Sequence, residues 1–383
     1  MAVHAAWKPE FKSYLRVEIV RGTPGAPPRL SLHFGHTDGV LVSDGPYERK
    51  LFSLLDGSRT CQEIIREMKS DPHITTVRVW GDLKKMFEFG LLQNAAADKA
   101  GLSQKHIKRL ERHIGYLGLL DTPGEKRYHL QRKLLESHVT VLGTGAMGSH
   151  VLDLLGRIGV GNFRIVDDDT VEVSNLNRGR FTRADIGKAK TQVVRELLLG
   201  IDDAITIEVQ EKRINSAQDI VDILQTGRKT DLVLLCADTP LAISSWMNQA
   251  ALQTGIPFLT SGYQGCGAEV GPLVIPGKTD CLMCLLGRDA PDSEDVSHVE
   301  VPQELVWLNE RAATGHPTDA AHTAFVASRL AHEAEMYLIG QTPNTLGTIL
   351  NYDPATWSFG SLERPRVRNC PACGRRHPDE TPE

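Results

Sequence analysis

Two stretches near the start of the chain alternate apolar and polar residues, Arg29–Phe34 and Gly39–Ser43. This period of two predicts a pair of short strands, with His36-Thr-Asp-Gly39 as the turn between them. Apolar residues then recur at helical spacing, which predicts three helices over residues 51–55, 60–68 and 79–89. A strand pair followed by three helices is the plan of a small α+β winged-helix domain, which we expect over residues 1–95.

The second of these helices carries a start signal of its own. Thr60 precedes the apolar stripe, and Glu63 follows three residues later. In a capping box of this spacing, the threonine hydroxyl and the glutamate carboxylate each accept a hydrogen bond from the other residue's backbone amide. We therefore expect the helix to begin at Thr60, with Ile64, Ile65 and Met68 on its buried side.

The pattern changes twice along the rest of the chain. Residues 96–137 are charged and helical in spacing, with Ser103 as a helix cap and a break at residues 121–124, so we expect a helical connector. In residues 138–383, strand segments alternate with helical ones; the strands are expected at residues 138–142, 162–166, 231–235 and 257–260, with another ending at Val209. This alternation predicts a Rossmann-like α/β domain with a doubly wound, mainly parallel sheet.

Composition and charge narrow the possible classes of protein. With 383 residues, 41% of them apolar, the chain has room for two or three globular domains. It has no run of 18 apolar residues and no signal-peptide pattern at its N-terminus, so we expect a cytoplasmic protein that does not enter a membrane. The net charge of −5, without a basic run, argues against nucleic acid as a partner.

Two Cys-x-x-Cys pairs stand in the second half of the chain, Cys281 with Cys284 and Cys370 with Cys373. Four thiolates in this spacing complete a tetrahedral shell around Zn²⁺ and leave no position for a substrate, which is typical of a structural metal site. Disulfides are the alternative, and the reducing compartment expected for this chain favours zinc.

A glycine-rich loop, Gly143-Thr-Gly-Ala-Met-Gly148, lies between a predicted strand and a helix predicted over residues 147–158. In that context the glycines let backbone amides approach phosphate oxygens at the helix N-terminus. Asp167 follows 24 residues after Gly143, at the end of the next strand, where a carboxylate accepts hydrogen bonds from ribose hydroxyls. These residues alone fit a nicotinamide-dependent dehydrogenase and an ATP-using enzyme equally well.

The run that follows this loop distinguishes the two. Asp167-Asp-Asp-Thr-Val-Glu-Val-Ser-Asn-Leu-Asn-Arg178 resembles the Asp-x-Asp-x-Val-x-x-Ser-Asn-Leu-x-Arg signature of the ThiF/MoeB family, bacterial relatives of the ubiquitin-activating enzymes. Gly187-Lys-Ala-Lys190, Cys236-Ala-Asp238 and the two cysteine pairs also match motifs of that family, in the family's order. The resemblance extends over residues 138–374.

This resemblance implies an ATP pocket for adenylation, in a homodimer whose ATP sites lie beside the subunit contact. The implied nucleotide-binding set is Gly143, Gly145, Gly148, Asp167, Asp169, Asn175, Arg178 and Lys190. Arg178 and Lys190 are implied to act in catalysis, because the leaving pyrophosphate gains charge that fixed cations stabilise. Asp238 is implied to act with them by holding Mg²⁺, a hard cation that prefers carboxylate oxygen.

One position departs from the family pattern. The family carries Arg-Tyr-x-Arg-Gln before the first strand, and its second arginine reaches the ATP of the partner subunit. Here the run is Arg127-Tyr-His-Leu-Gln-Arg132, with Leu130 in place of that arginine. Either Arg127 or Arg132 substitutes for it, or the contact is lost.

Cys266 lies on a glycine-rich loop after a predicted strand, where a thiol can form a thioester or a persulfide. The nucleophile of the family, where there is one, lies farther on, beyond the first zinc pair. Residues 288–315 of this chain contain no cysteine. A catalytic thiol and a plain loop residue are therefore both open for Cys266.

Residues 51–68, LFSLLDGSRTCQEIIREM, resemble the PqqD-like domains that bind leader peptides in ribosomal peptide (RiPP) biosynthesis. The resemblance implies that a leader joins the sheet edge as an added strand over the third helix, with anchors around residues 30–42 and 79–89. A DNA-binding winged helix and a structural cap are the alternatives. Acidic and basic residues are close to balanced over residues 1–100, so no phosphate-binding face is evident.

Together these features predict an enzyme that uses ATP and Mg²⁺, with structural Zn²⁺, to adenylate a carboxylate on a ribosomally synthesised precursor peptide. The carboxylate is the peptide C-terminus or an Asp or Glu side chain, and attack by an amide or amine then gives cyclisation or condensation. One alternative is adenylation of the C-terminus of a ubiquitin-like sulfur carrier. Another is a non-catalytic leader-binding partner protein, which the intact Asp167, Arg178, Lys190 and Asp238 oppose.

Overall fold

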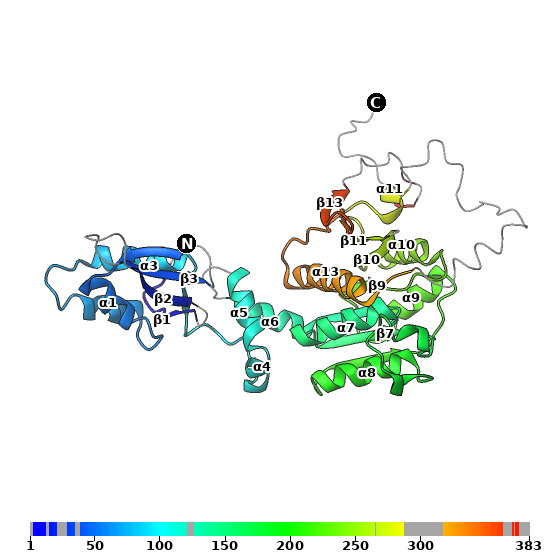
Figure 1. The fold of residues 1–383 in the computed structure, drawn as a ribbon, viewed down its shortest axis with the longest axis horizontal. Coiled ribbons are helices and arrows are strands. Elements are labelled where there is room, and N and C mark those ends of the chain that lie inside the picture. The colour runs from blue at the N-terminus through cyan, green and yellow to red at the C-terminus, as the bar shows by residue number, and fades with distance from the viewer. Residues whose placement is uncertain are drawn as a thin grey trace, which may run out of the picture. The chain divides into compact units, whose positions relative to one another are not determined.

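The computed structural model describes residues 3–12, 15–20, 29–34, 39–120, 126–264, 266–286, 317–362, 370 and 372–374 of the chain. The chain divides into two units, Met1–Arg132 and Lys133–Glu383, each with its own hydrophobic core (Figure 1). Residues 96–132, which belong to the expected connector, lie in the first unit.

In the first unit, β2 (Leu15–Val20), β3 (Arg29–Phe34) and β4 (Gly39–Ser43) form an antiparallel sheet in that order. The two predicted strands are β3 and β4, while the prediction omits β2, although its sequence LRVEIV alternates as well. Residues 35–38, most of the predicted turn, lie outside the described residues. A separate short pair joins β1 (Pro9–Phe11) to β5 (Leu92–Asn94).

Three helices follow this sheet, α1 (Pro46–Ser53), α2 (Cys61–Met68) and α3 (Thr76–Glu88). The capping box at the start of α2 is confirmed. The Thr60 hydroxyl accepts from the Glu63 amide at 3.2 Å, and the Glu63 carboxylate accepts from the Thr60 amide at 2.7 Å. Ile64 and Met68 pack in the core of the unit as expected, and Ile65 packs partly buried against them.

Several residues in the ranges expected to anchor a peptide are buried. Six apolar residues of β3 and α3 are buried inside the unit and cannot contact a peptide: Leu30, Leu32, Val79, Leu83, Met86 and Phe87. The apolar repeat of α3 marks the side of the helix that packs in the core of the unit. A peptide-binding groove would have to use the opposite, exposed side of α3. Among described side chains, the exposed large apolar residues of the three-stranded sheet and of α3 with its C-cap are Val17, Ile19, Val20, Val77 and Phe89.

Three more helices lead toward the second unit, α4 (Gln104–Arg109), α5 (Glu111–Leu120) and α6 (Arg127–Glu136). The predicted cap at Ser103 is confirmed, because its hydroxyl oxygen accepts from the His106 amide at 3.1 Å. Residues 121–124, the predicted break, lie outside the described part of the chain. The unit boundary falls within α6.

The second unit contains an eight-stranded sheet in the order β13-β12-β11-β10-β9-β6-β7-β8. Its strands are β6 (His138–Leu142), β7 (Asn162–Val166), β8 (Thr206–Gln210), β9 (Leu232–Leu235), β10 (Phe258–Gln264), β11 (Gly267–Val274), β12 (Ile349–Asp353) and β13 (Ser358–Leu362). The strands from β8 to β10 run parallel, which confirms the predicted mainly parallel α/β sheet. An antiparallel extension of β11, β12 and β13, which was not predicted, continues from β10.

Helices cover both faces of this sheet (Figure 1). On one side α7 (Ala146–Ile158) packs with α8 (Lys190–Ile201) and α13 (Ala320–Ile339). On the other side α9 (Ala217–Gln225) packs with α10 (Ile243–Thr254). Leu142, Val166 and Val233 contact the core formed with α9 and α10, while the intervening Val141 and Ile165 are buried on the other face. The remaining short elements are η1 (Val173–Asn175), η2 (Arg183–Asp185) and α11 (Leu282–Leu286).

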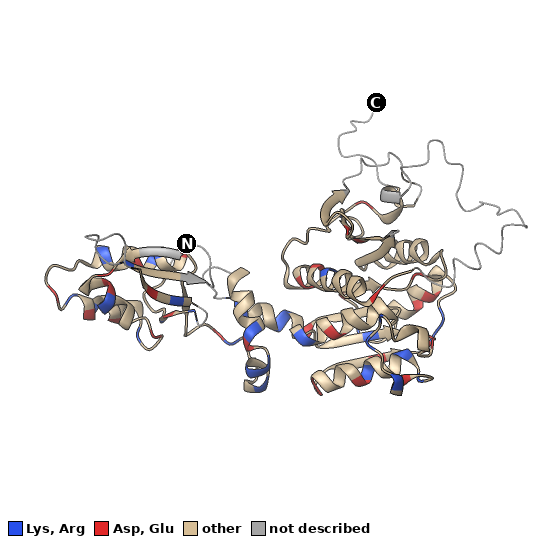
Figure 2. Ribbon diagram, viewed as in Figure 1, with Lys and Arg blue, Asp and Glu red and all other residues tan. Residues whose placement is uncertain are grey.

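Basic and acidic residues occur together on the elements of both units. Figure 2 shows Lys and Arg interspersed with Asp and Glu along both units, as expected for 43 basic and 48 acidic residues. No helix in the described residues is long and apolar enough to cross a membrane.

Candidate functional site

The candidate site begins where three parallel strands end side by side. Leu142 of β6 pairs with Val166 of β7 and with Leu235 of β9, so the residues that follow each strand meet at one edge. β7, the next strand in the chain, lies on one side of β6 and β9 lies on the other. Such a reversal of strand order opens a crevice at the carboxyl ends of the strands, where α/β proteins bind ligands.

The glycine loop occupies this crevice, and its three glycines have different reasons to lack a side chain. Gly143 has φ +91°, and a Cβ there would lie 2.7 Å from the Ala237 amide nitrogen. A Cβ on Gly148 would lie 2.0 Å from the Gly143 carbonyl oxygen. Gly145, the N-cap of α7, faces open space within 4 Å. Gly143 and Gly148 are therefore required by the fold, while Gly145 leaves the N-terminus of α7 open to an anion.

Asp167 ties this loop to the acidic run that follows β7. One carboxylate oxygen accepts from the Thr144 amide at 2.6 Å, and the other accepts from the Asp169 amide at 2.9 Å. The carboxylate thus holds the glycine loop and the start of the Asp167–Arg178 segment at a fixed separation. Asp167 therefore orders the loop in addition to the ribose contact predicted for it. The spacing of the motif alone does not reveal this ordering role.

Lys190 is a cation held at an unusual position. It begins α8, where the helix dipole disfavours positive charge, and its side chain is only 11% exposed. The Asp169 carboxylate offsets this cost with an ion pair of 2.7 Å to the Lys190 ammonium nitrogen. Because Asp169 is 64% exposed, a bound polyanion can replace it as the partner of Lys190. The structure therefore brings together two residues that the sequence placed in one nucleotide-binding set.

Arg178 and Asn175 both lie on the turn that contains η1. The Asn175 side-chain oxygen accepts from the Glu172 amide at 3.0 Å, so it caps this turn. The Arg178 guanidinium donates to the Ser174 carbonyl at 2.7 Å and to the Asn177 side chain at 2.9 Å, both exposed contacts. Arg178 therefore lies folded over its own turn, with both contacts made through Nη1.

Three residues of α7 hold the backbone beside Arg178, and the sequence analysis missed all three. His150 Nε2 donates to the Arg178 carbonyl at 3.0 Å, and the Ser149 hydroxyl accepts from the Arg180 amide at 3.1 Å. The buried Asp153 carboxylate forms an ion pair of 3.1 Å with the Arg180 guanidinium. Burial lowers the pKa of His150, which keeps its ring neutral. These residues follow the glycine loop directly, so one helix orders both the loop and Arg178.

Asp238 follows β9 at the same edge and is exposed. In the described part of the chain, the carboxylates close enough to share one cation are those of Asp167, Asp168 and Asp169, a group that does not include Asp238. The Mg²⁺ role implied for Asp238 therefore stays a prediction. Cys236, two residues before it, is partly buried, and desolvation raises the pKa of its thiol to about 12.

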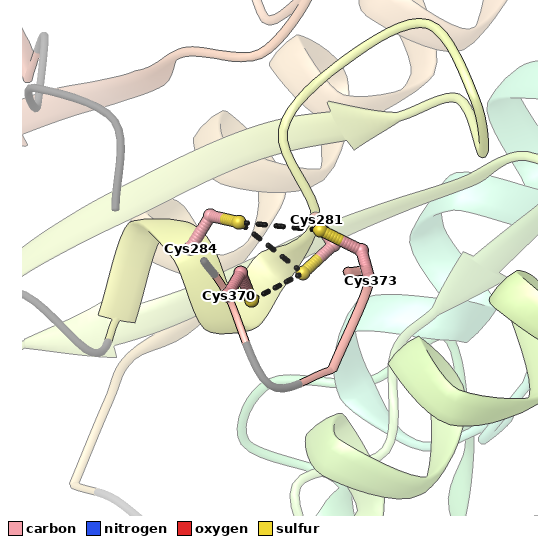
Figure 3. A group of neighbouring side chains, drawn as sticks. All are labelled: Cys281, Cys284, Cys370 and Cys373. Atoms are coloured by element: carbon pink, nitrogen blue, oxygen red, sulfur yellow. Dashed lines mark hydrogen bonds between the residues drawn. The ribbon is translucent and has the colours of Figure 1, made fainter. Parts of the chain in front are cut away.

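The four cysteines of the two pairs converge at one point (Figure 3). Their sulfur atoms lie 3.6 Å apart between Cys281 and Cys284, 3.8 Å between Cys281 and Cys370, and 3.6 Å between Cys284 and Cys373. Sulfurs bound at about 2.3 Å to a tetrahedral Zn²⁺ lie about 3.8 Å from one another, whereas a disulfide requires about 2.05 Å. The donor set and its spacing therefore fit zinc, and the cysteines are free thiols.

The remaining predicted residues make the following contacts. Leu130 is buried in α6, the Arg127 guanidinium donates to the Asn94 carbonyl at 3.3 Å, and Arg132 donates to the Ala100 carbonyl at 2.8 Å. Both arginines therefore contact the backbone of their own unit. Cys266 is exposed at the turn from β10 to β11. Residues 288–315 lie outside the described residues.

Comparisons with known proteins agree with this geometry. The model of the ThiF family matches residues 111–372. The sulfur carrier protein ThiS adenylyltransferase of Escherichia coli (strain K12) is 28% identical over 251 residues, 65% of this chain and 90% of that protein. The structure of E. coli MccB with ATP has a TM-score of 0.73 at 21% identity, covering 96% of this chain and 99% of that one. MccB in complex with N-formylated MccA has a TM-score of 0.72 at the same identity and coverage.

Proposed function

The chain belongs to the ThiF family of adenylyltransferases, and we propose that it activates a carboxylate on a ribosomally synthesised precursor peptide. A carboxylate oxygen attacks the α-phosphorus of ATP, an acyl-adenylate forms, and pyrophosphate leaves. An amide or amine of the peptide then attacks the activated carbonyl, which gives cyclisation or condensation and releases AMP. The observation that carries the proposal is the strand edge where Gly145, Asp167 and the Asp169–Lys190 pair meet.

Each residue of this edge has a role in the proposed reaction. The open N-terminus of α7 at Gly145 accepts a phosphate, and Asp167 accepts from the ribose while it orders the loop. Lys190 exchanges Asp169 for the polyphosphate, and Arg178 swings from Ser174 to the same anion. Asp238 or carboxylates of the Asp167–Asp169 group would hold Mg²⁺, and the bound ion would supply positive charge to the leaving pyrophosphate.

The first unit supports a peptide as the substrate. The nucleotide site lies in the second unit, and the first unit adds a separate three-stranded sheet. The edge strand of that sheet, β2, has the exposed apolar residues Val17 and Ile19. An extended peptide can add to such an edge through backbone hydrogen bonds and a few apolar anchors. The complex of MccB with N-formylated MccA, a structural neighbour at low identity, is consistent with a peptide partner.

A sulfur carrier is the second candidate substrate, because the curated relative adenylates the sulfur carrier ThiS. The two candidates separate in one assay. Full-length protein with ATP and Mg²⁺ is offered a precursor peptide with its leader, or a small carrier that ends in Gly-Gly, and pyrophosphate release is measured. We expect release with the peptide, and release with the carrier alone would replace the proposal by the second candidate.

Asp238→Ala tests whether the release is adenylation at this edge. We expect the variant to lose peptide-dependent pyrophosphate release and to keep leader binding, because the lost carboxylate acts on the leaving group and not on docking. Equal release by the variant and the parent would remove Asp238 from the mechanism. No release from the parent with any carboxylate would refute adenylation itself and favour a non-catalytic binding protein.

Leader binding is tested on the full chain by charge substitutions on exposed apolar residues. We expect Ile19→Asp to weaken leader binding if the leader joins β2, and Phe89→Asp to do so if it lies along α3. Leu119→Asp is the matched control, since Leu119 is exposed in the same unit but lies on α5. Unchanged binding in both test variants would make the first unit a structural cap.

A further inference from the structure

A second cavity, of about 600 Å³, lies between α13 and the antiparallel extension of the sheet. Most of its lining is apolar, including Val270 and Leu350 from the strands and Phe325 and Val326 from the helix. Arg329 and His332 of α13 lie at its polar side. A cavity of this size accommodates a large side chain with adjacent backbone.

The sheet register places this cavity at the same edge as the nucleotide site. β10 pairs with β9 only as far as Thr260, opposite Leu235, and then continues past the end of β9 to Gln264. The overhanging Tyr263 pairs with Ala268 of β11, which pairs in turn with Tyr352 of β12. Ala268 and Tyr352 both line the cavity. The cavity therefore lies at the end of the sheet where β9 and β6 terminate, with β10 and β9 between its strands and β6.

A run of aromatic rings connects the two sites. Tyr263 lies 5.5 Å from His322 between ring centroids, and His322 lies 5.9 Å from Tyr352. The Tyr352 ring then contacts Phe325 at 4.4 Å and stacks on Phe359 at 5.2 Å. At the other end of the run, the Tyr263 hydroxyl donates to the Thr323 hydroxyl at 2.9 Å, and Tyr263 belongs to the part of β10 that extends past the end of β9.

Aromatic surface is exposed next to the cavity, where Trp357 packs against the lining residues Phe325 and Tyr352. Trp357 is 68% exposed and Phe359 is 63% exposed, although both belong to the aromatic cluster. Trp357 also has φ +54°, a left-handed backbone conformation that bulky residues rarely adopt. Exposed aromatic side chains in a strained turn are typical of a binding surface and not of a solvated edge.

We propose that this aromatic cavity binds an aromatic side chain of the peptide whose carboxylate is adenylated at the neighbouring strand edge, and so selects the peptide near its reacting end. The proposal rests on the proposed function, which it deepens by giving the substrate a required residue. The occupant is a single aromatic ring, because Tyr352, Phe325 and Phe359 present ring faces and edges on several sides of one space.

The test uses the full chain and acetylated Gly-Ser hexapeptides with a free C-terminal carboxylate, each with one Phe at a different position. Binding is measured by isothermal titration in the presence of ATP without Mg²⁺. We expect Phe at one or two positions near the carboxylate to strengthen binding about tenfold or more over the parent hexapeptide. Trp357→Gly and Phe359→Ser should abolish that gain. Glycine also accepts the positive φ of residue 357, so loss of binding in Trp357→Gly does not stem from added backbone strain.

Val209→Ser is the matched control. Val209 is an exposed apolar residue on β8, the outermost strand on the side of the sheet away from β13. It should keep the full gain from Phe. A gain at no position, or a gain that survives in both cavity variants, overturns the inference. A third result also overturns it: Trp357→Gly changes the oligomeric state, as measured by light scattering, and leaves the gain from Phe unchanged. The exposed aromatic residues would then contact a second copy of the chain. Pyrophosphate release assayed separately with the precursor peptide shows whether the proposed function stands when this inference fails.

Discussion

The cysteine cluster and the strand-edge site are both built from short motifs, yet the side chains of the two sites find their binding partners in different ways. The four sulfurs of the cluster converge on one point, most of them buried, and a tetrahedral cation would use all of them. At the strand edge, charged groups pair with partners that are themselves exposed, as the largely buried Lys190 does with Asp169. A closed donor set stabilises the fold, whereas exchangeable partners leave charge available for a ligand.

Removing one cysteine should have the largest effect on stability. We expect about one Zn²⁺ per purified chain, and Cys370→Ser should lower the free energy of unfolding by several kcal/mol, because structural zinc contributes folding free energy. Elemental analysis and chemical denaturation measure both quantities. A folded, soluble protein without metal would contradict this prediction, and Cys266→Ser is the control, since Cys266 is exposed and outside the cluster.

Removing Lys190 should instead affect activity far more than stability. We expect Lys190→Met to lower peptide-dependent pyrophosphate release about a hundredfold, because the charge that develops on the leaving group loses a fixed cation. Its melting temperature should stay close to that of the parent, since Asp169 is mostly exposed and is resolvated easily. Lys188→Met is the matched control: Lys188 lies two residues away in a surface ion pair of 3.0 Å with Asp185. Equal losses in both variants would mean a general charge effect.

The α7 contacts should have a smaller effect, because they act through the placement of Arg178. We expect Arg180→Met to lower pyrophosphate release about tenfold, since the loop loses its ion pair with Asp153. Arg157→Met offers a close comparison, because Arg157 also pairs with Asp153, at 2.9 Å, but lies on α7 itself. Steady-state kinetics should show a lower kcat for the loop variant alone. A matching loss in Arg157→Met would assign the effect to Asp153 and the helix.

The smallest expected effect is on pH dependence of stability. Burial lowers the pKa of His150 below its usual value of 6.5, so the unfolded chain binds a proton that the folded chain resists. Stability should therefore fall as pH drops below about 6.5, and His150→Gln should show a shallower decline in denaturation midpoints measured from pH 7.5 to 5.5. An unchanged slope would show that His150 is solvated in the folded protein.

Local signals in the sequence predicted the elements and the motif residues well. The strand–glycine–helix order predicted β6, the Gly143 loop and α7, because each depends on residues that are neighbours in the chain. The capping box at Thr60 was predictable for the same reason. Contacts between distant segments were not. Arg164 sits in the apolar strand β7, yet its fully buried guanidinium pairs with Glu208 at 2.7 Å and donates to the Ile223 carbonyl.

The amino-acid sequence alone pointed to the residues for which we propose a chemical role: the cysteine pairs, the glycine loop, and the charged run from Asp167 to Lys190. Only the tertiary structure decided how they are used. The strand register brings Gly143, Asp167 and Asp238 to one end of the sheet. The fold also brings Asp169 and Lys190 together as an ion pair. The part of β10 that extends past β9 places an aromatic cavity at the same end of the sheet. Periodicity along a chain reports which side of an element is buried. Which elements meet, and in what register, depends on packing among residues far apart in sequence, and the sequence pattern does not contain it.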